Sequence, residues 1–207
     1  MLAVLSKKEM SVGTEHLPDF IWQNYEVREW KHACAILRHD FPLEWKDIIE
    51  VLGAFRFKRS WISEGGGRKS KVAAAIDAAL YERGWIEKQF DTEILVDKRK
   101  LESPTHQIDC FRNRVALEIE WNNKDPFFDR DLNNFRLLFE LRAVSVGVIV
   151  TRCDDLQDIF KAIGRGRSFG ASTTHMSKLL PRIEGGGGGG CPVLAFGITK
   201  NLYSEDE

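Results

Sequence analysis

The chain has 207 residues, of which 43% are hydrophobic and 29% are charged. This composition supplies a packed core and excludes global disorder, and the length favours one domain. The net charge of −1 excludes a protein that coats nucleic acid through overall positive charge. No apolar run reaches the roughly 20 residues that cross a bilayer, and the N-terminus lacks the order of a signal peptide.

The positions of the cysteines and histidines argue against a disulfide framework and against a zinc site. The four cysteines are far apart and form no Cys-x-x-Cys pair; they are Cys34, Cys110, Cys153 and Cys191. This spacing is typical of reduced thiols rather than of a disulfide framework. The five histidines are also scattered, so the sequence gives little support to a zinc site.

Helices dominate the first part of the chain. Residues 19–41 place tryptophans and apolar residues at loosely helical spacing, and residues 43–57 continue as an amphipathic helix. Gly65–Gly67 predict a flexible or tightly turned loop. The alanine-rich residues 71–83 predict a strong helix, which Gly84 ends.

The second part alternates strands and helices. Residues 85–96 predict a strand region, residues 109–122 a β-hairpin, and residues 126–139 a helix with apolar side chains three and four apart. Residues 144–151 are almost wholly apolar, as in a strand covered on both faces. The remaining expected elements are a helix near 154–162, a polar glycine-rich segment at 164–175, a short helix at 176–183 and a last strand from residue 191.

This order of elements predicts an α/β fold in which helices flank a central mixed β-sheet. We expect a single domain over residues 1–207. Its N-terminal part, about residues 1–84, is expected to be helical, and the sheet core to cover about residues 85–200.

The hairpin carries three carboxylates. Along residues 115–122 apolar side chains alternate with Glu118 and Glu120, so these two lie on one face, roughly 6.5–7 Å apart. Asn113 predicts a turn that brings Asp109 near Glu118. Three acids repel one another unless a cation lies between them, and Mg²⁺ prefers carboxylate and water oxygens. The alternative is a solvated polar face of an amphipathic sheet.

Basic residues form two clusters despite the balanced total charge. The first cluster is Arg56, Lys58, Arg59, Arg68, Lys69 and Lys71. The second is Lys161, Arg165, Arg167, His175, Lys178 and Arg182. Concentrated basic segments fit a protein that meets a polyanion on one face, whereas solvated loops and helix faces are the alternative.

The glycine-rich segments do not form a phosphate-binding loop. Gly185–Gly190 is followed by Cys-Pro, so it lacks the lysine and the helix of the GxxxxGK[ST] motif. We expect this run to be a linker or a place of unusually close backbone approach. The 164–175 segment also lacks the strand–turn–helix context of a dinucleotide site. The sequence has no GxSxG motif, the pattern that would indicate a serine nucleophile.

The order helix, acidic hairpin, helix and apolar strand resembles the PD-(D/E)xK nuclease core. Within it the chain is most similar to the BglII/BstYI family of type II restriction endonucleases. The resemblance runs from about Trp45 to Phe196, and its most specific part is Thr105–Phe128, with Asp109 followed nine residues later by Glu118.

The resemblance implies a homodimeric, Mg²⁺-dependent endonuclease of prokaryotic, cytoplasmic type. It would cut double-stranded DNA at a short palindrome, and the sites known in the family are built around GATC. Asp109 and Glu118 would be the metal ligands. Position 120 is usually glutamine in the family, so Glu120 is either a metal-proximal residue or the base that activates water. Glu87 falls near where the family supplies an extra acidic or amide residue.

DNA readout requires donors and acceptors aimed at base edges. Asn122 and Asn123 leave the acidic strand at its end, and asparagine suits adenine, although a turn is the alternative. The other expected DNA-binding residues follow the helix near 154–162; they are Arg165, Arg167, Ser172, Thr173, Thr174, His175 and Lys178.

The sequence alone is compatible with more than one interface and more than one function. Cutting a palindrome calls for two active sites related by a twofold axis, and either the helix at 43–57 or that at 71–83 supplies the interface. A structure-selective or repair nuclease on the same core is a competing function. A non-catalytic DNA-binding protein with a decayed core is another.

Overall fold

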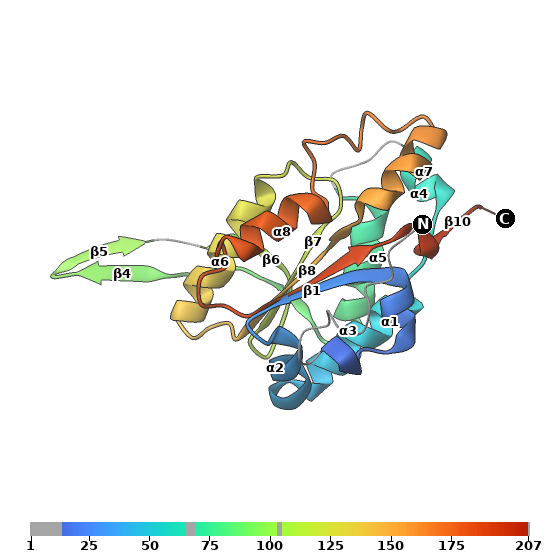
Figure 1. Cartoon of the computed structure of the whole chain (residues 1–207). Helices are drawn as coiled ribbons and strands as arrows, with labels where there is room; N and C mark the ends of the chain where they lie inside the picture. Colours follow the sequence, from blue (N-terminus) through green and yellow to red (C-terminus); the bar gives the residue numbers. More distant parts are fainter. Residues whose placement is uncertain (1–13, 65–68, 103–104, 207) are drawn as a thin grey trace.

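The computed structural model describes residues 14–64, 69–102 and 105–206. A six-stranded sheet of order β1-β9-β8-β7-β6-β3 forms its centre (Figure 1). The strands are β1 (Tyr25–Trp30), β3 (Ile86–Lys88), β6 (Ile108–Arg112), β7 (Val115–Glu120), β8 (Val146–Arg152) and β9 (Val193–Ile198). β7, β8 and β9 are mutually parallel, whereas β1, β6 and β3 each run antiparallel to their neighbours.

Helices cover both faces of this sheet, so the expected α/β class is confirmed. The α-helices are α1 (Asp19–Asn24), α2 (Ala33–Asp40), α3 (Pro42–Ala54), α4 (Arg59–Ser63), α5 (Lys71–Tyr81), α6 (Phe127–Glu140), α7 (Gln157–Ala162) and α8 (Met176–Glu184). Short 3-10 turns are η2 (Thr14–His16), η3 (Asp154–Leu156) and η4 (Lys200–Leu202). Two small sheets pair β2 (Phe57–Lys58) with β10 (Tyr203–Ser204), and β4 (Glu93–Val96) with β5 (Arg99–Glu102).

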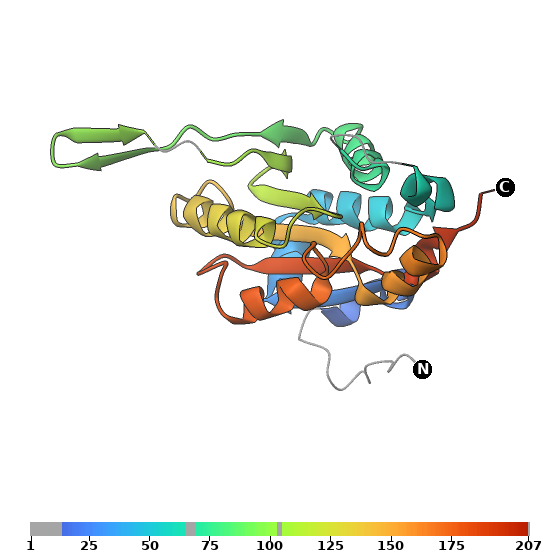
Figure 2. The ribbon, with the colours of Figure 1, turned by 90° about the horizontal axis from the view of Figure 1, so that it is seen from above.

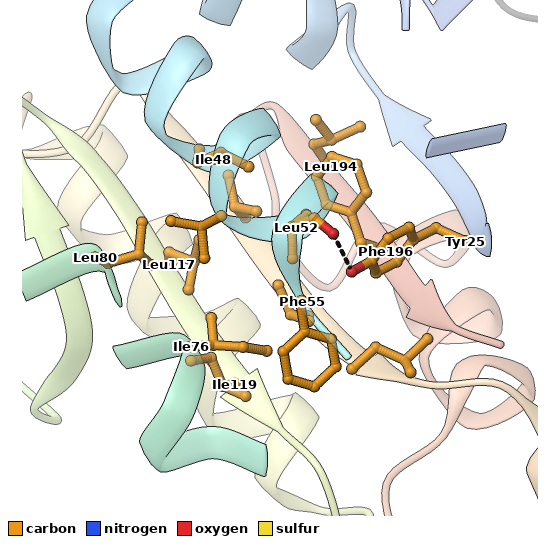
Figure 3. Packing of buried hydrophobic residues seen from close by; sticks show 14 of the residues in the cluster. Tyr25, Ile48, Leu52, Phe55, Ile76, Leu80, Leu117, Ile119, Leu194 and Phe196 are labelled. Atoms are coloured by element: carbon orange, nitrogen blue, oxygen red, sulfur yellow. Dashed lines mark hydrogen bonds between the residues drawn. The ribbon is translucent and has the colours of Figure 1, made fainter. Parts of the chain in front are cut away.

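The two faces of the sheet bury separate apolar clusters. α2, α3 and α5 pack on one face, where the labelled side chains in Figure 3 are Tyr25, Ile48, Leu52, Phe55, Ile76, Leu80, Leu117, Ile119, Leu194 and Phe196. On the other face α6 and α8 cover Ala116, Ile149 and Ala195. Every residue of β7 is therefore buried, including its two glutamates.

Local sequence explains the helix limits. Ser70 caps α5, because its hydroxyl accepts a 3.0 Å hydrogen bond from the Ala73 amide. Gly84 follows the helix with φ +83°, a backbone conformation that glycine adopts without a side-chain penalty. The predicted stop at Gly84 is thus confirmed, whereas the loop expected at Gly65–Gly67 lies outside the described residues.

The N-terminal part is not wholly helical, so that expectation was wrong. Residues 19–41 contain α1, the strand β1 and α2. β1 pairs with β9, Tyr25 opposite Ile198, and the Tyr25 hydroxyl donates a 2.8 Å hydrogen bond to the Leu52 carbonyl. An edge strand with one half-buried face mixes polar and apolar residues without a clear period. Its pairing with a distant segment therefore decides that these residues form a strand.

Smaller boundaries also differ from expectation. The helix expected at 43–57 ends at Ala54, and Phe57 joins β2 instead. The strand region expected at 85–96 divides into β3 and β4, which belong to different sheets. Among the residues that the structure describes, none of the helices combines the length and the apolar character needed to cross a bilayer.

The glycine run after α8 is a site of close backbone approach rather than a loose linker. A Cβ atom on Gly187 would lie 2.9 Å from the Arg182 carbonyl oxygen, and one on Gly189 would lie 2.6 Å from Arg136 Cγ. Gly189 also has φ +57°. The run can therefore pass against α6 and α8 only because side chains are missing.

Candidate active site

The acidic hairpin forms as its sequence predicts. Asn113 and Arg114 connect β6 to β7 with φ values of +43° and +68°, as in the two-residue turns that match the twist of paired strands. Cys110 lies opposite Leu117, which places Asp109 beside Glu118. The Asp109 amide donates a 3.2 Å hydrogen bond to Glu118 Oε2, and the Ile119 amide donates a 2.9 Å bond to Asp109 Oδ2.

Glu118 occupies an environment that a lone carboxylate does not tolerate. Its side chain is only 1% exposed, and among the described residues its Oε1 has no hydrogen-bond partner. Burial, followed by the negative charges of Asp131 and Asp109, raises the pKa of Glu118 well above its ordinary value. A buried acid with an unpartnered oxygen beside other acids is stabilised by a cation.

Glu120 is held on both of its oxygens. The residue is 2% exposed; its Oε1 accepts a 3.2 Å bond from Arg130, and its Oε2 accepts a 2.7 Å bond from Asn123. Burial and the neighbouring Asp131 raise the pKa of Glu120 to about 9, although Asn123 and Arg130 act in the opposite direction. This burial excludes the solvated polar face considered as an alternative for the hairpin.

Asp131 is a fourth acid of the site, which the motif did not include. It comes from α6, is fully buried, and accepts bonds of 2.9 and 2.8 Å from Arg130. Its Oδ2 has no partner among the described residues, and burial raises its pKa to about 6. The signal was present in the sequence, because Asp131 lies on the apolar stripe of α6 between Phe128 and Phe135.

The acids fit a cation bound with the help of substrate. Among the described residues, no group of three or more His, Cys, Asp or Glu side chains is already arranged to hold a metal ion. Mg²⁺ is usually bound through one or two carboxylates together with water and substrate phosphates. The pair Asp109 and Glu118, with the unpartnered Glu118 Oε1, meets that requirement.

Glu87 lies near this site without bonding to it. It is exposed on the edge strand β3, whose neighbour β6 carries Asp109. The Tyr81 hydroxyl donates a 2.9 Å bond to the Asp109 carbonyl. Burial is the largest cause of the raised pKa of Tyr81, and the charge of Glu87 contributes to it. Glu87 therefore borders the site through Tyr81.

The expected DNA-binding segment divides into buried and accessible members. Thr173, Thr174 and His175 are buried. Arg152 donates a 2.7 Å bond to the Thr173 hydroxyl, and the Thr174 amide donates a 2.9 Å bond to the Asn123 carbonyl. These residues anchor the segment beside the acidic strand.

The remaining members of the set reach solvent. Asn123, Arg167 and Ser172 are exposed, while Asn122, Arg165 and Lys178 are half-buried. Asn122 donates a 3.1 Å bond to the Ser168 carbonyl, so it ties the end of β7 to the 164–175 segment. Lys178 Nζ lies 3.9 Å from Asp125 Oδ2, so the two side chains form an ion pair. The structure thus brings both groups of expected readout residues to the same end of β7.

A mixed α/β sheet with this acidic hairpin defines a restriction-endonuclease core, the core of a DNA hydrolase. A family model described as restriction endonuclease BglII/BglIII matches residues 25–198, and the chain belongs to that family of type II restriction endonucleases. The similarity expected from the hairpin and its flanking elements is thereby confirmed. A comparison with curated proteins gives no match.

Proposed function

We propose that this endonuclease cuts double-stranded DNA at a short palindrome in a Mg²⁺-dependent reaction that leaves a 5′-phosphate and a 3′-hydroxyl. The observation that carries the proposal is the buried, unpartnered Glu118 Oε1 beside Asp109. A cation at this place removes the repulsion between the acids, and Mg²⁺ usually takes substrate phosphate oxygens among its remaining ligands.

Asp109 and Glu118 would hold the Mg²⁺. When bound there, the ion polarises the scissile phosphate and lowers the pKa of a water molecule. The hairpin fixes both carboxylates through backbone amides, since the Asp109 and Ile119 amides each donate to the other strand's acid. No side chain has to form a covalent bond to the substrate.

Glu120 is assigned the role of accepting the proton of the attacking water. Burial and Asp131 raise the pKa of Glu120 to about 9 in the metal-free protein, so the positive charge of a cation bound at Asp109 and Glu118 would be needed to favour the ionised form that accepts a proton. Asn123 and Arg130 fix the orientation of the carboxylate. The Glu120→Gln variant separates this role from simple positioning, because glutamine can still accept the Asn123 bond. A large fall in kcat supports the base, whereas an unchanged kcat assigns Glu120 to holding Asn123 and Arg130.

DNA recognition is assigned to the residues that reach solvent at the end of β7. Asn122 and Asn123 suit adenine edges, and arginine suits guanine. Arg165, Arg167, Ser172 and Lys178 supply donors for bases and phosphates. We propose a site built around GATC, as the resemblance to the family implies. The buried Thr173, Thr174 and His175 support this surface from beneath.

A homodimer completes the proposal. One cut in each strand of a palindrome places two active sites about a twofold axis. α3 and α5 remain the two candidates for the interface.

Plasmid digestion tests the function. Wild-type protein with Mg²⁺ should give discrete fragments, and Asp109→Ala or Glu118→Ala should give none. Asp158→Ala is a matched control, because Asp158 is exposed on α7. Full cleavage by either acidic-site variant contradicts the metal assignment. If the protein cleaves branched or nicked DNA in preference to intact duplex, the function is that of a structure-selective nuclease and not of a restriction endonuclease.

A further inference from the structure

A two-stranded ribbon projects from the body of the protein in both views (Figures 1 and 2). It consists of β4 and β5, residues 93–102, and is called the β4–β5 arm below. Glu93 pairs with Glu102 at its root and Val96 with Arg99 at its tip, so Asp97 and Lys98 form a two-residue turn.

The arm has too little apolar contact to be stable by itself. Leu95, Val96 and Leu101 are 71%, 53% and 39% exposed. An isolated two-stranded hairpin is marginally stable in water. Exposed apolar side chains on such a ribbon therefore indicate a surface that a partner covers.

The root of the arm is fixed to β6, the strand that carries Asp109. The Thr105 amide donates a 3.0 Å bond to the Phe90 carbonyl, and the Phe90 amide donates a 2.9 Å bond to the Thr105 hydroxyl. The Phe90 ring packs edge-on against Phe111, with centroids 5.2 Å apart. Lys88 on β3 lies opposite Ile108 on β6, one residue before Asp109. The arm thus leaves the sheet beside the acids.

The tip of the arm carries free positive charge. Three consecutive basic residues, Lys98, Arg99 and Lys100, follow Asp97. Lys100 forms an ion pair with Glu93. Among the described residues, the side chains of Lys98 and Arg99 form no hydrogen bond or ion pair, so both are available to a polyanion.

We propose that the β4–β5 arm inserts into a groove of the duplex DNA held at the Asp109 and Glu118 site. The inference rests on the proposed function and adds a contact surface to it. Lys98 and Arg99 bind phosphates, while Leu95 and Val96 pack against sugars and base edges. Charge complementarity and the shared root with the catalytic strand favour DNA over a second copy of the chain.

The dimensions of the arm fit this role. The major groove is about 12 Å wide and about 8.5 Å deep, and it admits a two-stranded β-ribbon. Asp97 lies seven positions after the fixed Phe90, which gives a reach of roughly 23 Å at about 3.3 Å per residue. The tip therefore reaches phosphates away from the one being cleaved.

The salt dependence of DNA binding tests the inference. Wild type and the Lys98→Ala/Arg99→Ala variant are compared by fluorescence anisotropy on a labelled duplex that carries the mapped cleavage site, with EDTA present to prevent cleavage. Each lost phosphate contact reduces the slope of log K against log salt by about 0.9. The proposed homodimer loses two contacts from each protomer, so the slope of the variant should be smaller by about 3.6. Between about 50 and 200 mM salt, wild type should lose roughly a hundredfold more affinity than the variant.

Two controls separate the possible outcomes. Arg38→Ala/Lys200→Ala removes the same number of charges from α2 and η4, away from the candidate dimer helices, and its slope should match wild type. An equal slope in the arm variant overturns the inference, whereas wild-type protein that binds no duplex overturns the proposed function instead. Sedimentation velocity of the Leu95→Ser/Val96→Ser variant tests whether a second copy of the chain, rather than DNA, covers the arm. If this variant dissociates a dimer while its DNA binding is unchanged, a second copy covers the arm and the inference is wrong.

Discussion

The Glu120→Gln variant should be more stable than wild type when no divalent cation is present. Burial and Asp131 raise the pKa of Glu120 to about 9, from an ordinary value near 4.5. A carboxyl group with a raised pKa favours folding below the unfolded pKa, and that contribution is lost as the pH rises through the folded pKa. The wild-type free energy of unfolding should therefore fall between about pH 4.5 and pH 9.

The size of the effect follows from the same pKa difference. One pKa unit corresponds to about 1.4 kcal/mol, and pH 7 lies about 2.5 units above the ordinary pKa, so at pH 7 the cost of keeping Glu120 protonated is about 3.5 kcal/mol at most. Glutamine is neutral at every pH and can keep the 2.7 Å contact with Asn123. The Glu120→Gln substitution should remove most of this cost, giving a gain of about 1–3 kcal/mol at pH 7 that grows towards pH 9.

Urea unfolding at pH 5, 7 and 9 in EDTA measures this directly. The difference between Glu120→Gln and wild type should be small at pH 5 and largest at pH 9. Glu82→Gln, at an exposed position after α5, should follow wild type at every pH. A Glu120→Gln protein that is less stable than wild type at pH 9, or whose stability changes with pH in parallel to it, refutes the reasoning.

Three further predictions concern the site and its supports. Asp131→Asn removes one of the two carboxylates that pair with Arg130, at 2.8 Å, and should weaken Mg²⁺ affinity or activity by about 10–100-fold. The Mg²⁺ concentration for half-maximal cleavage measures this, and an unchanged value contradicts it. Gly147→Ala places a Cβ atom 2.3 Å from the Phe135 ring and should cost about 1–3 kcal/mol in urea unfolding, with wild-type stability the opposing result. Ser70→Ala removes the cap of α5 and should cost about 1 kcal/mol, whereas Ser70→Gly should cost less; equal losses would show that the cap is not the cause.

Sequence alone was sufficient where the decisive interactions are local. The alternation around Glu118 and the turn at Asn113 predict the hairpin, because period and turn conformation are properties of neighbouring residues. The stop of α5 at Gly84 is local in the same sense. These features also carry the similarity to the endonuclease family.

Long-range contacts explain what the sequence did not predict. β1 depends on pairing with β9 at the other end of the chain, so its own residues carry only a weak signal. Thr173 and Thr174 have the composition of a surface loop, but Arg152 and Asn123 bond to them and bury them. Asp131 joins the acids only because α6 packs across β7, and its place on an apolar stripe was the one available clue.

Mapping the ends of the fragments from a single Mg²⁺ digest tests the central claim most directly. If Asp109 and Glu118 form a sequence-specific hydrolytic site, sequencing should find every cut within one short palindrome, with a 5′-phosphate and a 3′-hydroxyl at each end. The Glu118→Ala protein should produce no such ends. Cuts at unrelated sequences, 3′-phosphate ends, or the same cuts made by Glu118→Ala would contradict the account.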